Sequence, residues 1–382
     1  MSVFAYNLLH KTRDLSGVLS TVIAAAPRFI GLFKSVPAAK NTKHEWLEDQ
    51  ISGRGLTVVS NATLTATVSE ADAAKIKVGT LLGIKDDSAL FKVTAKTTTT
   101  FTYALAAANG SSTTAMAADD AVIIIGFPTK EASGEGDGEQ TFRSVGSEYN
   151  NTMIVRKEIV VSGTAMATTT HDQVENSINR QTEFAFMEVA RDLNRLAIFA
   201  NRVTPTSSVN GVFGGLYEFG TQTGGLSVVG GGARFDTFMV NDAAALILDA
   251  GGDPDTILCS PGQARVLSAD NLDKIRIIRE DLRRGSFVGQ IVNDVTGKTM
   301  QVVADPDFLD TEPWIVDSDG FGLSHLQGRK MTDKDATNKD FDGIKRLAIG
   351  EITLEFKNAK QRLCRISGAQ GSAAALAAIK AG

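Results

Sequence analysis

Few residues in this sequence could do chemistry by their type and spacing, and the most suggestive run is Thr296-Gly297-Lys298-Thr299. A Gly-Lys-Thr triplet ends the phosphate-binding loop of many nucleotide hydrolases, where the lysine and the hydroxyl group contact the phosphates and the magnesium ion. That loop also needs a glycine five positions before Gly297, and Val292 stands there. Strand-like residues flank the run, so we predict a hairpin turn and no phosphate site.

Residues 131–140 (EASGEGDGEQ) are the second candidate, because their glycines imitate a nucleotide-binding loop. They carry four acidic side chains and no basic one: Glu131, Glu135, Asp137 and Glu139. These carboxylates would repel a phosphate, which phosphate sites attract with backbone N–H groups. Mutual repulsion and the lack of apolar side chains instead predict a flexible loop.

The other templates for catalysis or metal binding fail on residue type or spacing. No Gly-X-Ser-X-Gly run is present, so the sequence lacks a nucleophile elbow. The four histidines lie far apart without the spacing of metal ligands. The two cysteines, Cys259 and Cys364, are too few for a disulfide framework or a structural zinc site, and Cys259 fits a small core residue of a buried strand. We predict no catalytic, cofactor or metal site; an enzyme with an unrecognised site is one alternative.

The composition describes an ordinary folded chain. Its 382 residues carry a net charge of −5, with 43% hydrophobic and 22% charged residues. This balance excludes a disordered chain, a fibrous chain and a basic protein that coats nucleic acid. Residues 15–26 follow Lys11 and Arg13 and faintly resemble a secretory signal, but Asp14 and Pro27 argue against it. We predict instead an N-terminal arm, residues 1–43, that packs its apolar residues on another surface.

Residues 56–127 differ in composition from the rest of the chain. They are rich in Thr, Ala and Val, contain no proline, and hold six short β-like runs separated by turn signals. Their spacing is typical of small β-barrels. We therefore predict an inserted all-β unit of five to six strands with its own core.

The strongest element is a helix predicted over residues 171–201. A continuous helical stripe runs along it, formed by Val174, Ile178, Ala185, Val189, Leu193, Leu196 and Ala200. Phe184, Met187 and Ile198 lie on a second face, so we expect this helix to be covered from two sides. Leu193 and Leu196 are therefore the helix residues on which we expect assembly to depend.

The rest of the chain predicts a mixed domain. A Gly-rich connector, residues 203–234, is expected either to move or to thread between neighbouring chains. Helices are predicted over 235–250 and 261–271 around a strand at 256–260, which implies a sheet-based domain. Further strands are predicted at 289–292, 299–303, 314–317, 350–357 and 361–367. The small residues from Gly368 onward predict a mobile tail.

Several runs in this order resemble tailed-bacteriophage major capsid proteins with the Hong Kong 97-like fold. They are HEWLED at 44–49, VVSGTA at 160–165, GGDPDTILCSPGQARVL at 251–267 and IGEITLEFKNAKQRL at 349–363, together with the long helix. The resemblance implies an α+β fold with an N-terminal arm, an extended loop, a peripheral domain with a spine helix, and an axial domain. Residues 56–127 exceed a bare extended loop, so we expect an inserted small all-β domain.

The resemblance divides the chain into regions. They are an arm (1–43), the extended-loop region with peripheral strands (44–55 and 128–163), the inserted domain (56–127), the spine helix and connector (164–234), a mainly axial domain (235–348), a C-terminal strand region (349–367) and a tail (368–382).

The resemblance also implies that the chain functions through its contacts with other subunits. The chain would self-assemble as hexamers and pentamers into an icosahedral head shell around double-stranded DNA, in a virion assembled in the bacterial cytoplasm. Glu131, Glu135, Asp137 and Glu139 would then meet Lys or Arg of a neighbouring subunit. Decoration, portal and scaffolding proteins and non-specifically bound DNA are the expected partners, and no membrane or cofactor is expected. A bacterial encapsulin nanocompartment is the nearer alternative.

The C-terminal stretch from Lys357 is basic. It carries Lys357, Lys360, Arg362, Arg365 and Lys380 and no acidic residue. It would either face the packaged DNA or form solvated surface.

Overall fold

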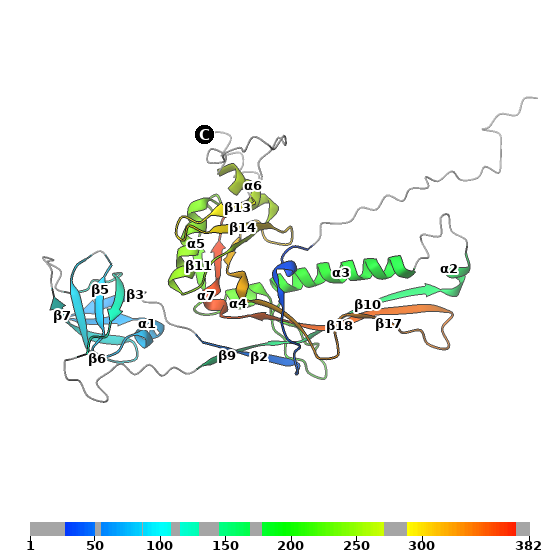
Figure 1. The fold of residues 1–382 in the computed structure, drawn as a ribbon, viewed down its shortest axis with the longest axis horizontal. Helices are drawn as coiled ribbons and strands as arrows, with labels where there is room; N and C mark the ends of the chain where they lie inside the picture. The colour runs from blue at the N-terminus through cyan, green and yellow to red at the C-terminus, as the bar shows by residue number, and fades with distance from the viewer. Residues whose placement is uncertain are drawn as a thin grey trace, which may run out of the picture.

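The computed structural model shows a barrel, an elongated part and a compact part (Figure 1). The residues that it describes are 27–49, 55–85, 87–107, 115–129, 145–168, 178–270 and 289–371. The barrel lies apart at one end of the long axis, and α3 extends toward the other end. Within the described residues no helix combines the length and the apolar character needed to cross a membrane.

The elongated part is a five-stranded sheet with a long helix on it. The strands are β1 (Lys34–Ser35), β10 (Met153–Ser162), β16 (Phe321–His325), β17 (Thr332–Asp335) and β18 (Gly343–Phe356). β10 and β18 pair antiparallel over their whole common length, from Met153 opposite Ile352 to Ser162 opposite Gly343. The predicted strand at 350–357 is therefore only the second half of β18.

The long helix, α3 (Ile178–Phe199), lies on this sheet as its apolar stripe predicts. Ala185, Val189 and Leu193 are buried on the side that faces the strands. The helix ends at Phe199, two residues before the predicted end, because the Ala200 carbonyl accepts a hydrogen bond from Gly215 N and the chain turns away. The predicted start at residues 171–177 lies outside the described residues. The short helix α2 (Gly163–Ala167) precedes it, with Ser162 as its N-cap.

The compact part is built on a six-stranded mixed sheet. Its order is β11 (Leu226–Val229), β19 (Leu363–Ser367), β15 (Trp314–Val316), β12 (Thr256–Cys259), β14 (Thr299–Ala304) and β13 (Gln290–Val292). The helices α5 (Thr237–Asp249) and α6 (Pro261–Asp270) contribute to its apolar core. Asp236 caps α5 by accepting a bond from Met239 N at 2.9 Å. β13 and β14 pair antiparallel around Gly297, whose φ is +68°, so the turn predicted for this run is confirmed.

Part of the Gly-rich stretch 203–234 packs in the core, whereas residues 204–210 are exposed. That the stretch moves or threads between neighbouring chains stays a prediction. It holds the helix α4 (Leu216–Gly220), whose Leu216 and Phe219 are fully buried. Its glycines permit close packing: a Cβ on Gly215 would lie 2.6 Å from the Ala197 carbonyl oxygen. Gly215 therefore permits α4 to lie close to α3, whereas Gly224 and Gly231 have a positive φ and open space around them.

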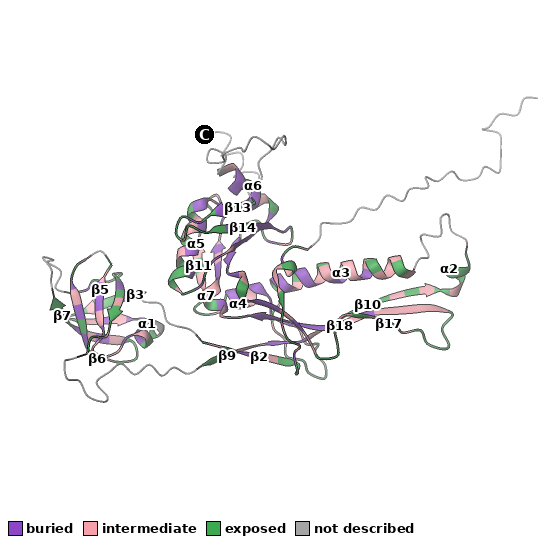
Figure 2. Ribbon diagram, in the orientation of Figure 1, coloured by how far each residue is buried: buried purple, intermediate pink, exposed green. Residues whose placement is uncertain are grey.

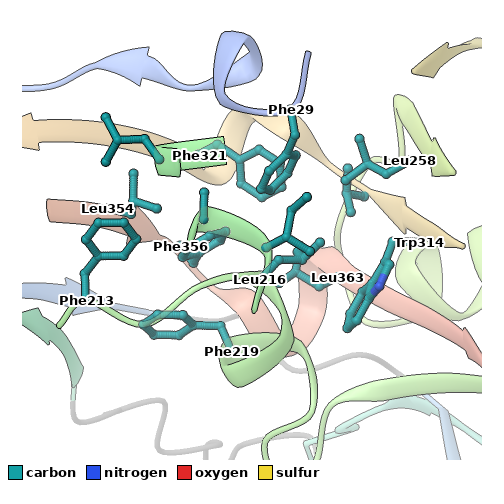
Figure 3. Packing of buried hydrophobic residues seen from close by; sticks show 14 of the residues in the cluster. Phe29, Phe213, Leu216, Phe219, Leu258, Trp314, Phe321, Leu354, Phe356 and Leu363 are labelled. Carbon is teal, nitrogen blue, oxygen red and sulfur yellow. The ribbon is translucent and has the colours of Figure 1, made fainter. Parts of the chain in front are cut away.

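One apolar core joins the elongated and compact parts (Figure 3). Phe29 packs edge-on against Phe321 at 5.8 Å between ring centroids, and Phe219 stacks on Phe356 at 5.0 Å. Trp314 is fully buried beside them. Figure 2 shows burial concentrated here, whereas the far ends of α3 and β10 are only partly covered.

The barrel closes in the strand order β3-β4-β7-β6-β5-β8. Its strands are β3 (Gly55–Ala62), β4 (Thr65–Val68), β5 (Leu81–Ile84), β6 (Leu90–Lys96), β7 (Thr100–Ala107) and β8 (Ala121–Gly126). Its core cluster consists of barrel residues alone, centred on Phe91, Phe101 and Tyr103. The predicted all-β unit is thus a closed barrel, with one addition, the short helix α1 (Glu70–Lys75) capped by Ser69.

The two remaining strands form a separate two-stranded sheet. β2 (Lys43–Glu48) and β9 (Gly146–Asn151) pair antiparallel, from Lys43 opposite Asn151 to Glu48 opposite Gly146. β2 contains most of the HEWLED run at residues 44–49. The last short elements are η2 (Ile30–Leu32), η5 (Ser318–Gly320) and α7 (Ala359–Arg362).

Candidate assembly surfaces

The described part of the N-terminal arm is fixed to the subunit's own core. Asp305 is buried, and its Oδ2 accepts bonds from Arg28 N at 2.9 Å and from Phe29 N at 3.1 Å. β1 then adds to the sheet parallel to β16, and Ala39 N donates to the His325 carbonyl at 2.9 Å. Phe29 itself is fully buried. Residues 28–39 therefore fold with the subunit, which the arm prediction did not foresee.

Leu193 and Leu196 both belong to the core beneath α3. Leu193 is 7% exposed within the shared apolar cluster, and Leu196 is partly buried against it. This cluster also contains Phe29, Trp314 and Leu354, so it is the core of the subunit itself. An effect of these two leucines on assembly would therefore act through the stability of the subunit.

Arg202 binds the end of the β2–β9 pair that contacts the core. We call this end, at His44 and residues 148–150, the foot of the pair. Its guanidinium lies 2.6 Å from Glu148 Oε1 and 2.5 Å from Glu218 Oε1. The same group donates to the Tyr149 carbonyl at 2.7 Å and lies 4.6 Å from the centre of the Tyr149 ring. Because Arg202 is largely buried, these contacts hold β9 against α4 in one orientation.

Two further contacts hold the other side of this foot. His44 Nε2 lies 2.5 Å from Glu355 Oε1, so β2 is bound to the end of β18. The buried Asn150 amide donates to the carbonyls of Gly214 at 3.1 Å and Leu354 at 2.8 Å. The pair therefore leaves the core from a rigid base. Sequence reasoning missed these groups, because Glu148, Arg202 and Glu355 are far apart in the chain and form no local motif.

A groove of about 620 Å³ lies between the far ends of β10 and α3. Apolar side chains of Ile159, Val161 and Phe184 line it. At its edge Lys157 Nζ lies 2.9 Å from Asp192 and 3.5 Å from Glu188. The groove thus combines apolar walls with a charged rim, which is the usual composition of a protein contact surface.

Several large apolar side chains are exposed on separate surfaces. Leu47 on β2 is 77% exposed, and Phe238 on α5 is 76% exposed. Ile154 and Val160 lie on the outer face of β10 and are more than half exposed. Exposed apolar groups on several sides of one chain are typical of contacts with several neighbours.

The side chains that could bind a metal ion or react as nucleophiles are spread through the described residues. In that part of the chain no group of three or more His, Cys, Asp and Glu could hold a metal ion. Burial raises the pKa of the Cys259 thiol to about 12, which makes it a poor nucleophile. The four acidic residues between 131 and 139 lie outside the described residues.

Three of the five basic C-terminal residues pair with the chain's own carboxylates. Lys357 lies 3.0 Å from Glu355 Oε2, and Arg362 lies 3.3 Å from Asp317 Oδ2. Arg365 lies 2.5 Å from Glu312. The charges of these three residues are balanced within the subunit, which does not favour a DNA-facing role for them. Lys360 is exposed, and Lys380 lies outside the described residues, so both alternatives for the stretch stay open.

The comparison with family models accounts for almost the whole chain. Residues 3–370 match the model of the SU10 major capsid protein. The chain belongs to this family. It is therefore a capsid shell protein and a virion component. No curated protein matches the sequence.

Solved capsid structures share the fold of this capsid protein. The Cyanophage A-1(L) capsid is 11% identical, with a TM-score of 0.56 over 96% of this chain and 98% of that chain. A structure of Microbacterium phage Oxtober96 is 12% identical, with a TM-score of 0.50 over 94% and 96%. The resemblance to phage capsids with the Hong Kong 97-like fold is thus confirmed.

The encapsulin alternative is matched more weakly. The holo-SrpI encapsulin complex from Synechococcus elongatus is 8% identical, with a TM-score of 0.43 over 59% of this chain and 77% of that chain. The family match over residues 3–370, and not this comparison, favours a phage capsid protein over an encapsulin.

Proposed function

We propose that this capsid protein assembles as hexamers and pentamers into the icosahedral head shell of a tailed bacteriophage, around its double-stranded DNA. The observation that carries the proposal is the family match over residues 3–370. A closed shell requires heterologous contacts on several sides of each subunit. The β2–β9 pair and the far ends of β10 and β18 extend away from the compact part, where they can reach such neighbours (Figure 1).

We propose a division of the chain into domains that follows the two sheets. The compact sheet, which lies mostly within residues 235–316, forms the axial domain. The elongated sheet, which includes β16, β17 and β18, forms the peripheral domain with α3 as its spine, so the predicted axial range 235–348 extends too far at its C-terminal end. Residues 56–127 fold as an inserted domain that projects from the subunit. Their closed barrel and separate core support this division.

The contacts between subunits carry the function, and the chain has no catalytic role. Glu131, Glu135, Asp137 and Glu139 bond to Lys or Arg of the neighbouring subunit on which the extended loop lies. The ion pairs of Arg202 support this arrangement of the loop, because they fix the direction in which β2 and β9 leave the core. Portal, decoration and scaffolding proteins are further partners, and assembly takes place in the bacterial cytoplasm.

Electron microscopy of particles purified after expression of the full chain tests the proposal. We expect closed shells with five-fold and six-fold capsomers. In particles isolated from infected cells, nuclease-protected double-stranded DNA should fill these shells. Shells that contain an enzyme and no DNA would favour the encapsulin alternative, and the absence of closed particles from both sources would contradict the proposal.

A further inference from the structure

β10 is an edge strand of the elongated sheet. It pairs with β18 along one side, and no other described strand pairs with its second side. The strand is 10 residues long, so its free side offers a long row of backbone donors and acceptors to another strand. Such an edge readily pairs with a second chain, and proteins recognise partners by adding a strand in this way.

The groove described above follows this free side. Six consecutive residues of β10, 157–162, line it together with Phe184 of α3. Successive side chains of a strand point to opposite faces, so a wall made of consecutive residues includes the backbone of the strand. Within the described chain, no residue of β18 lines the groove. The groove therefore lies where a further strand would add to the sheet.

The sequence of β10 has the same chemical pattern in both directions from Lys157. Three apolar residues, 153–155, precede the run Arg156-Lys157-Glu158, and three apolar residues, 159–161, follow it. When two copies of one strand pair antiparallel across a two-fold axis, residues equally far from the centre lie opposite each other. With Lys157 at the centre, apolar residues meet apolar residues of the second copy, and Arg156 meets Glu158.

On the outer face, this arrangement brings together side chains that are exposed in the single chain. Ile154 and Val160 are 56% and 54% exposed, and each would lie opposite the other in the second copy. Arg156 and Glu158, which already contact each other within one strand, would also alternate in sign across the axis. Apolar pairs and pairs of opposite charge in directly opposite positions both stabilise antiparallel strands.

On the inner face, Lys157 would lie opposite Lys157 of the second copy, and like charges in such positions repel. The chain already balances this charge. Lys157 Nζ lies 2.9 Å from Asp192 Oδ2 and 3.5 Å from Glu188 Oε2, and both carboxylates belong to α3. Each lysine therefore points toward its own helix, and the repulsion across the axis is reduced.

The charges disfavour the neighbouring registers. Opposite side chains must share a face of the sheet, so a different register moves the centre to another residue of β10. A centre at Arg156 would place this arginine opposite itself and Ile154 opposite Glu158. A centre at Glu158 would place this glutamate opposite itself and Arg156 opposite Val160. The charge pattern thus favours Lys157 as the centre by penalising the alternatives.

We propose that β10 pairs antiparallel with β10 of a second copy of this chain, across a two-fold axis at Lys157. The two elongated sheets then form one continuous sheet, with both copies of α3 on the same face. Ile159 and Val161 lie opposite Val155 and Met153 of the second copy, which closes the groove. This proposal rests on the proposed shell function, which brings many copies of the chain together, and it names one contact by which they meet.

Disulfide trapping in the full chain tests this pairing. Ile154→Cys combined with Val160→Cys should link two chains when shells or free subunits are treated with oxidised glutathione. The two positions of one chain cannot react with each other, because six residues of strand separate them by about 20 Å. Both positions are exposed, so the fold should tolerate the changes, and the two native cysteines are buried and do not compete.

The matched controls are the two single variants, Ile154→Cys and Val160→Cys, because neither position lies opposite itself. We expect the double variant to give covalent dimers at least about tenfold faster than either single variant, since a disulfide needs Cβ atoms about 4 Å apart. Non-reducing gels measure the rate, and mass spectrometry identifies the linked peptide.

The outcomes separate this pairing from the shell function. Closed shells in which the double variant links no faster than the single variants would overturn the pairing and leave the shell function standing. The same result in free subunits that form no shells would overturn both. A rapid link in free subunits without closed shells would support the pairing and contradict the shell function. A faster reaction of Ile154→Cys with Glu158→Cys would move the centre to Arg156 and overturn the register proposed here.

Discussion

The Nε2 atom of His44 lies 2.5 Å from Oε1 of Glu355, and this contact joins β2 to the last residues of β18. Lys357 Nζ lies 3.0 Å from the other carboxylate oxygen. Burial alone would raise the pKa of Glu355, but the hydrogen bonds from His44 and Lys357 outweigh it and hold this pKa below its ordinary value. The ionised carboxylate therefore stabilises the foot of the β2–β9 pair.

The first prediction is that this contact weakens in acid. A carboxylate with a lowered pKa stabilises the folded state above its ordinary value of 4.5, and the contribution is lost as the pH falls toward the lowered value. Glu355→Gln should therefore reduce the free energy of unfolding by about 1–3 kcal/mol at pH 7. Its melting temperature should also fall less steeply than that of the wild type below pH 5.

The matched control for this prediction is Glu158→Gln. Glu158 also has a lowered pKa, chiefly through its hydrogen bond from Lys345, but it lies on the outer face of β10. Glu158 is exposed, so solvent screens its ion pairs and this variant should change the pH profile little. Parallel profiles for the wild type and Glu355→Gln would contradict the assignment of Glu355 as the titrating group.

The second prediction concerns the helix residue Leu193. Leu193→Asp would place a charge without a partner in the core between α3 and the sheet, which costs several kcal/mol or forces the carboxyl group to stay protonated. We expect insoluble subunits and no shells. Arg191→Asp, two residues away on the exposed side, should give soluble subunits. Normal shells from Leu193→Asp, seen by electron microscopy, would disprove the role of this helix as a buried spine.

The sequence predicts those helices and strands in which apolar residues recur with the period of the element and so mark its buried face. The stripe through Val189 and Leu193 defines α3, and the alternation of Ile352, Leu354 and Phe356 marks the second half of β18. The first half, from Gly343 to Leu347, is only partly buried, so no such contrast exists there. β1 is two exposed residues that pair with β16 through the backbone alone. Local patterns cannot predict strands of this kind.

The contacts at the candidate assembly surfaces also could not be predicted from local patterns, because they join residues that are far apart in the sequence. Arg202 meets Glu148, which is 54 positions away, and His44 meets Glu355, which is 311 positions away. Neither pair has a spacing that marks a site. The glycines at 214, 215 and 220 likewise indicated only a connector, whereas they permit close packing of α4 against α3 and Trp314. The resemblance to capsid proteins, which spans the chain, was therefore more informative about function than any single motif.

The third prediction is that the barrel folds without the rest of the chain. Its closed sheet and separate core imply that residues 55–127 alone give a cooperative thermal transition and a β-type circular dichroism spectrum. Phe91 is fully buried and packs edge-on against Tyr103 at 5.2 Å, so Phe91→Ala should cost about 3–5 kcal/mol and abolish the transition. A random-coil spectrum of the unmodified fragment would mean that its strands depend on the remainder of the subunit.

The fourth prediction concerns the acidic side chains of residues 131–139. Replacing Glu131, Glu135 and Glu139 by Gln and Asp137 by Asn removes four charges and leaves the described core unchanged. We expect free subunits with an unaltered melting temperature and a weaker tendency to form shells. Each exposed pair is worth only about 0–1 kcal/mol, but every subunit of a shell repeats the contact.

The salt dependence of assembly separates this electrostatic effect from a change in loop shape. Salt at 0.1 M screens exposed charges over about 10 Å, so added salt should weaken wild-type assembly more than assembly of the neutralised variant. Limited proteolysis gives the decisive comparison, since a loop that lies on a neighbour is protected only in the shell. The matched control replaces Glu70 and Asp72, two acids of α1 on the barrel, by Gln and Asn. Equal cleavage of residues 131–140 in free subunits and in shells would show that the loop makes no contact between subunits.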